Sequence, residues 1–283
     1  MPVYPGCRDE RYPGISSWES LEHIGPMTAS VADAALAMSV LAGPTPRDRA
    51  SLPLELSSWA ITPQEHLRGV RLAYSANLGF ADVDAEVRAV TAEAAQRLAA
   101  VLGASLRDAH PGIGDIGMAF EAIVALDTDR DGLRRMARAQ GIALEGWLGR
   151  LIERNWTAAE FTDALMQRKR VVNLAWRFME TYDFFLTPTA GSPAFELGRE
   201  GPATIDGVEV PGTTWLAFSA LGNFTGLPAA SVPVGQTRAG LPVGLQIMGR
   251  HLDDIGVLAL SMVCESLFPM QWPPVADRRP WVN

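Results

Sequence analysis

The chain has 283 residues, of which 48% are hydrophobic and 20% are charged, proportions typical of a soluble globular protein. This length suits one large α/β domain or two small ones. The net charge of −8 argues against a nucleic-acid partner and against docking on an anionic membrane, because both require a clustered positive surface. The one basic run, at 168–170, is predicted to be the solvated face of a helix.

The cysteines and the start of the chain point to a cytoplasmic protein. Cys7 and Cys264 lie far apart and neither belongs to a CxxC motif, which favours a reducing compartment. No signal peptide is expected, because three prolines interrupt the first fourteen residues. The longest uncharged stretch, 210–237, contains several prolines and glycines and is therefore not a membrane span.

The first half of the chain alternates between helix and strand signals. Residues 1–27 are predicted to be extended, and a helix is predicted from the N-cap Ser30 to Gly43. A short strand over 69–75 precedes the clearest helix, 84–102, and another short strand follows around Ser105. This alternation predicts an α/β fold.

The second half continues the alternation around a long helical region. Residues 116–182 have apolar positions spaced three and four apart, so a helical insert is predicted there. Strands are expected at 184–186, 229–234 and 243–248, a hairpin turn at Asp206-Gly207, and a last helix over 253–267. The prediction is one domain over 1–283, a mixed β-sheet flanked by helices.

Three stretches resemble motifs of the amidase signature family. Residues 20–35 (SLEHIGPMTASVADAA), 182–189 (YDFFLTPT) and 223–246, which holds NFTGLP, SVPVG and GLPVGLQ, occur in the family's order. Ala29 stands where the family usually carries Arg. Each motif also has a structural explanation, since Gly-Pro and Leu-Pro pairs begin or end elements. The resemblance implies hydrolysis of a carboxylic amide C–N bond, without a cofactor.

The catalytic residues that the resemblance implies are not found in the chain. The family uses a Lys and two Ser residues, with a Gly-Gly-Ser-Ser-Gly-Gly loop whose amides stabilise the oxyanion. Both precede the Gly-Pro-Met segment, which begins here at Gly25. The single lysine, Lys169, lies between two arginines in a predicted helix, and neither Ser16-Ser17 nor Ser57-Ser58 is flanked by glycines. We therefore expect an amidase signature fold lacking its N-terminal part, with no catalytic residues and no activity alone.

Three other patterns do not carry a function. Gly112–Gly117 matches a dinucleotide-binding glycine motif, but no apolar strand leads directly into its first glycine. Asp127, Asp129 and Asp131 open like a calcium loop but lack its last acidic ligand, so a helix-capping turn is predicted. The four histidines have no metal-ligand spacing.

Two functions remain open from the sequence. The chain is either the substrate-pocket portion of an amide hydrolase or a non-catalytic truncated product or binding module of the same fold. In the first case a small amide substrate is expected beside the NFTGLP motif, bound by Trp215, Phe218, Asn223 and Thr225. An unpaired sheet edge would favour self-association or pairing with a missing N-terminal segment.

Overall fold

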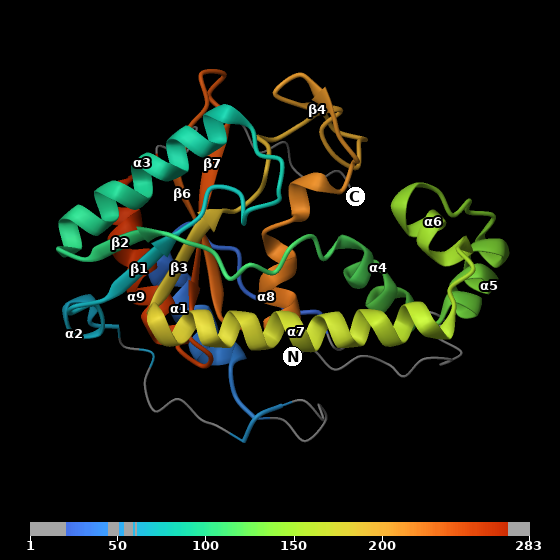
Figure 1. Ribbon diagram of the computed structural model, residues 1–283, viewed down its shortest axis with the longest axis horizontal. Helices are drawn as coiled ribbons and strands as arrows, with labels where there is room; N and C mark the ends of the chain where they lie inside the picture. Colours follow the sequence, from blue (N-terminus) through green and yellow to red (C-terminus); the bar gives the residue numbers. More distant parts are fainter. Residues whose placement is uncertain (1–20, 45–50, 54–58, 60, 271–283) are drawn as a thin grey trace, which may run out of the picture.

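The fold is built on a mixed five-stranded sheet. The computed structural model describes residues 21–44, 51–53, 59 and 61–270 (Figure 1). In the order β2-β1-β3-β7-β6, the strands are Ser105–Asp108, Arg71–Tyr74, Phe184–Pro188, Pro242–Gly249 and Ala229–Gln236. β1 pairs in parallel with β2 and β3, whereas β7 pairs antiparallel with β3 and β6. The predicted mixed sheet flanked by helices is confirmed.

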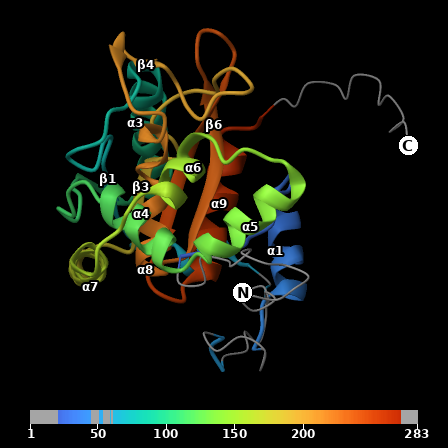
Figure 2. The same cartoon turned by 90° about the vertical axis from the view of Figure 1, so that its right-hand side faces the viewer.

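The sheet has an apolar layer on each face, because side chains along each strand point alternately to the two faces. Phe184 and Leu186 of β3 therefore pack with α3 (Ala85–Leu102) and α9 (Asp254–Leu267). Phe185 packs on the other face with α4, α7 and α8, which are Gly117–Leu126, Ala158–Thr181 and Ser219–Thr225. Figure 2 shows the sheet between α4, α7 and α8 on one side and α9 on the other.

The helix ends follow the capping residues. Ser30 caps α1 (Val31–Leu41) by accepting a hydrogen bond from the Asp33 backbone, and α1 packs on α9. Asp84 begins α3, and Gly103, in the left-handed conformation, ends it. A short helix, α2 (Pro63–His66), precedes β1. These elements confirm the predictions for the first half of the chain within the described residues; residues 1–20 lie outside them.

The helical character predicted for residues 116–182 is present, with three interruptions. The region comprises α4, α5 (Arg130–Gln140), α6 (Gly146–Glu153) and α7. Asp129 caps α5 through the Gly132 backbone, so the acidic turn is a helix cap, as predicted. The predicted hairpin forms between β4 (Thr204–Ile205) and β5 (Val208–Glu209). None of the helices in the described segments combines the length and apolar character that crossing a bilayer requires.

The prediction of a solvated basic face at 168–170 is wrong for Arg168, which is half-buried. The Arg168 Nε donates to the Phe224 carbonyl at 3.1 Å. Arg170 and Lys169 are exposed, as predicted, although an Arg170 guanidinium nitrogen also donates to the Ile113 carbonyl at 3.0 Å. The reason is tertiary, since α7 lies between α8 and the loop before α4, and both present backbone carbonyls to its flanks.

Candidate functional site

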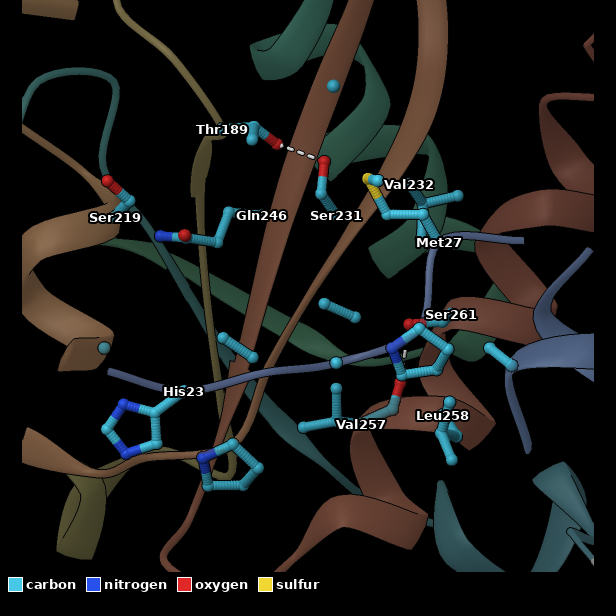
Figure 3. A pocket seen from close by; sticks show the side chains of 18 of the residues that line it. His23, Met27, Thr189, Ser219, Ser231, Val232, Gln246, Val257, Leu258 and Ser261 are labelled. Carbon is cyan, nitrogen blue, oxygen red and sulfur yellow. Dashed lines mark hydrogen bonds between the residues drawn. The ribbon is translucent and has the colours of Figure 1, made fainter. Parts of the chain in front are cut away.

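A long groove runs beside strand β6, where segments far apart in the sequence meet. Its volume is about 1880 Å³, and it lies between residues 23–31, the loop 189–195, helix α8 and the strands β6 and β7 (Figure 3). Small-molecule pockets are typically about 300–1,000 Å³. The groove therefore has room for a small ligand together with a covering polypeptide segment.

A row of polar side chains lies on the α8 face of the sheet, and two of them, Ser231 and Gln246, line the groove. The strand registers align Thr187 of β3, Gln246 of β7 and Ser231 of β6. The Gln246 side-chain nitrogen donates to Thr187 Oγ1 at 3.1 Å and to the Phe218 carbonyl at 3.3 Å. Because Gln246 is buried, these two bonds hold its amide in one orientation.

Thr189 and Ser231 join their hydroxyl groups across strand β7. Thr189 directly follows β3, where ligands of α/β sheets commonly bind, at the carboxyl end of a parallel strand. Its Oγ1 lies 2.7 Å from Ser231 Oγ. The dashed line in Figure 3 marks this hydrogen bond. Gly244 of β7 lies beneath the pair, and its carbonyl accepts a hydrogen bond from the Thr189 backbone at 2.9 Å. Nearby, the buried Ser192 Oγ has no hydrogen-bond partner among the described residues.

Two aromatic side chains form one wall of the groove. Trp215 belongs to a single 3₁₀ turn, Thr214–Leu216, and packs edge-on against Phe195, with ring centres 5.6 Å apart. The Trp215 indole nitrogen donates to the Glu200 carbonyl at 2.9 Å, which orients the ring. Both rings are half-buried and line the groove, so they offer an apolar surface to a ligand.

The remaining residues of the predicted substrate site are divided between groove and core. Asn223 and Thr225 of α8 line the groove. The Asn223 side chain donates to the Leu21 carbonyl at 2.6 Å, and Thr225 Oγ1 donates to the Leu221 carbonyl at 2.8 Å. Phe218 is fully buried and does not line the groove. We expected Trp215 and Phe218 to share one helical face, but α8 begins only at Ser219, after the 3₁₀ turn, and Trp215 lines the groove whereas Phe218 packs in the core.

Arg168 is a half-buried cation that lines the groove. Burial lowers the pKa of its guanidinium, and the negative charge of Asp127 partly opposes this effect. The guanidinium is nevertheless charged at neutral pH, as arginine is throughout proteins, and its Nε donates to the Phe224 carbonyl.

The groove does not contain a lysine among the described residues. Lys169 is exposed on α7 and is not a lining residue, and both Ser-Ser pairs lie outside the described part of the chain. In that described part, no group of three metal-ligating side chains occurs. The glycine motif at 112–117 follows the edge strand β2 after an intervening loop rather than directly.

Sequence reasoning overlooked four residues of the groove floor. Thr189, Ser231, Gly244 and Gln246 all belong to the quoted motifs, but none was chosen as a site residue. The available signal was the alternation along β7, which places Gly244 and Gln246 on one face.

Comparison with known proteins agrees with the motifs that border the groove. The Amidase family model matches residues 10–258. The chain is 28% identical to a glutamyl-tRNA(Gln) amidotransferase subunit of Thermodesulfovibrio yellowstonii, covering 93% of this chain and 58% of the relative. It is 32% identical to an acylamidase of Rhodococcus erythropolis, covering 90% and 53%. Among solved structures it is similar to a bacterial aryl acylamidase of the amidase signature family, with a TM-score of 0.74 and 29% identity, covering 87% and 53%. The chain thus spans little more than half the length of these relatives.

Proposed function

The chain belongs to the amidase signature family, and we propose that it forms the substrate-binding part of an enzyme that hydrolyses carboxylic amide C–N bonds. One observation carries this proposal. The three motif stretches are widely separated in the sequence, yet residues 23–31, Thr189 and several residues of 223–246 contribute to the lining of one groove. A shared groove is the arrangement expected if these motifs serve a common substrate.

The nucleophile and its base are proposed to come from another polypeptide segment. A serine hydroxyl attacks an amide only when a base within hydrogen-bond reach accepts its proton. The one lysine of the sequence, Lys169, is exposed on α7, away from the groove lining. We therefore propose that this chain alone does not hydrolyse amides.

Two features of the surface support the proposal that a further polypeptide segment covers the groove and the adjacent sheet edge. Among the described residues, β6 pairs only with β7, so its other edge is open to a further strand. Large apolar side chains between residues 24 and 41 are also exposed, among them Met27, which is 100% exposed, and Val40, which is 79% exposed. An apolar surface of this kind marks a contact with another polypeptide. That polypeptide is either the proposed catalytic segment or a second copy of the chain.

The substrate is proposed to be an uncharged amide whose apolar part packs against Phe195 and Trp215. These rings line the groove, and the Trp215 indole nitrogen is already satisfied by Glu200. Among the similar solved structures, the name of the aryl acylamidase indicates an aromatic substrate group, which suits this apolar wall.

Complementation tests the proposal. The chain is mixed with, or fused to, the part of the Rhodococcus erythropolis acylamidase that the similarity does not cover, and hydrolysis of benzamide, propionamide and glutamine is measured. We expect turnover of benzamide by the completed protein and none by either part alone. Turnover by the chain alone that disappears in a Ser16→Ala or Ser17→Ala variant would refute the proposal that the nucleophile comes from another polypeptide segment. A completed, folded protein without activity would favour the alternative of a non-catalytic binding module.

A further inference from the structure

The hydroxyl pair of Thr189 and Ser231 depends on a glycine between them. Neighbouring strands lie about 4.8 Å apart, so side chains two strands apart do not normally meet. Here a Cβ atom on Gly244 would lie 2.8 Å from Thr189 Oγ1 and 2.9 Å from Ser231 Oγ, closer than Cβ atoms pack. The two hydroxyl groups therefore occupy the space of a side chain at 244. Gly244 is not among the glycines with positive φ, so this space, not backbone conformation, requires glycine there.

The pair differs from three other hydroxyl groups of the groove in how its protons are used. Ser219, Thr225 and Ser261 each donate their proton to a backbone carbonyl. Thr189 and Ser231 bond to each other, and among the described residues neither side chain has another partner. One hydroxyl donates to the other, so the donor keeps both of its lone pairs, and the acceptor keeps its own proton and one lone pair for a ligand. Ser231 is exposed and Thr189 is half-buried, so the groove has access to both.

A donor and an acceptor side by side match one chemical group especially well. A primary carboxamide presents its carbonyl oxygen and one N–H on the same side, so it can accept from one hydroxyl while donating to the other. A secondary amide in its preferred trans form presents the two groups on opposite sides. A carboxylate has no proton to donate at neutral pH, so it cannot donate to one hydroxyl while it accepts from the other.

We propose that the Thr189–Ser231 pair above Gly244 is a positioning site for the primary carboxamide group of a substrate. The inference rests on the proposed function and narrows its substrate class to primary amides. The pair holds the amide group by two hydrogen bonds on the groove floor while the apolar part of the substrate faces Phe195 and Trp215. It does not supply the nucleophile.

Ligand-observed NMR titration of the 283-residue chain tests this site. The probes are benzamide, N-methylbenzamide and acetophenone, which share a phenyl ring and a carbonyl but differ in the adjacent N–H. Thr189→Val and Ser231→Ala remove one hydroxyl each. Thr162→Val and Ser266→Ala are matched controls, because these hydroxyls donate to helical carbonyls outside the groove.

The wild-type chain is expected to bind benzamide about fivefold more tightly than the other two probes, the value of one net hydrogen bond. Each groove variant should lose this preference, and the double variant should bind no more weakly than either single variant, because the pair acts as a unit. The control variants should keep the preference. Circular dichroism confirms folding, and Ser231→Ala, at an exposed position, remains a test if Thr189→Val does not fold.

Three results would overturn the inference: equal binding of the three probes, an unchanged preference in both groove variants, or no binding of benzamide by the wild-type chain. None of these results decides the proposed function, which the complementation assay tests separately. Conversely, a preference that follows the two hydroxyls stands even if the completed protein hydrolyses nothing.

Discussion

Replacing Asp183 with asparagine probes how the second sequence motif stabilises the sheet. The Asp183 carboxylate accepts hydrogen bonds from the Arg71 backbone at 2.7 Å and from the Arg71 guanidinium at 3.1 and 3.2 Å. An Arg250 guanidinium nitrogen lies 2.7 Å from Oδ1 of the same carboxylate. One carboxylate therefore connects the start of β1, the start of β3 and the end of β7. Asparagine keeps the shape and one acceptor but loses the charge.

The expected loss is about 2 kcal/mol in the free energy of unfolding at pH 7. A hydrogen bond to a charged group contributes about 1.5–3 kcal/mol, and an exposed ion pair about 0.2–1 kcal/mol. The Asp183 side chain is 22% exposed, whereas Arg71 and Arg250 are 45% and 44% exposed, so solvent weakens the ion pairs more than the backbone bond. For a chain of this size the loss corresponds to roughly 4–8 °C in melting temperature.

The pH dependence of the loss has a definite sign. Burial raises the pKa of Asp183, but the hydrogen bonds from Arg71 and the charges of Arg250 and Arg71 outweigh it and hold the pKa below its ordinary value. A carboxylate with a depressed folded-state pKa stabilises fully above its unfolded pKa of about 3.9, and this stabilisation is lost as the pH falls through the folded-state value. The difference between wild type and Asp183→Asn should therefore be constant from pH 7 to pH 5 and shrink towards pH 3.

Thermal melts followed by circular dichroism at several pH values measure this difference. Glu93→Gln is the control, because Glu93 forms an exposed pair with Arg97 at 3.9 Å on α3 and its loss should shift the melting temperature by only about 1–2 °C. A melting temperature of Asp183→Asn equal to wild type at pH 7 would refute the assigned contribution. A deficit that is the same at pH 3 and pH 7 would refute the role of the charge.

Four further outcomes are expected. Burial raises the pKa of Cys264 to about 12, so in a Cys7→Ser variant at pH 8 the thiol should react with iodoacetamide in urea but not in the folded protein. Ser192→Ala removes a buried hydroxyl without a described partner and should leave the melting temperature equal or higher; a clear decrease would reveal a partner. Size-exclusion chromatography should show self-association that Met27→Ser reduces, whereas a wild-type monomer with a cooperative melt would contradict the open surface. In the completed enzyme, Trp215→Ala should change the preference for benzamide over propionamide; an equal loss of both rates would make Trp215 a packing residue only.

Local chemistry was enough to predict most helices and strands. Asp84 and Gly103 cap helix α3 at its two ends, as the sequence predicts, and the Asp206-Gly207 turn forms the expected hairpin. Both residues of that turn have positive φ, 49° and 79°, which Asp tolerates and Gly adopts freely. Such signals are contained within a few neighbouring residues, so no knowledge of the tertiary structure is needed.

Predictions that depended on neighbouring elements succeeded less often. The burial of Arg168 was missed because helical spacing does not reveal which elements flank α7. Phe218 was placed with Trp215 on one helix because the 3₁₀ turn that contains Trp215 has no distinct sequence signal. In both cases the missing information was tertiary contact, which local propensity does not contain.

The hydroxyl pair on the groove floor is a functional feature that local sequence patterns could not predict, because it depends on tertiary contacts. Thr189, Ser231 and Gly244 come from three neighbouring strands or their ends, and the motifs that contain them also have purely structural explanations. Their meeting requires the strand order β3-β7-β6, which places the hairpin of β6 and β7 beside a strand that precedes it by forty residues or more. The remaining sequence signal is Gly244 itself, because a glycine inside a strand often marks the close approach of another group. In this groove that group is a pair of hydroxyls, and the glycine that admits them also leaves them accessible to a substrate.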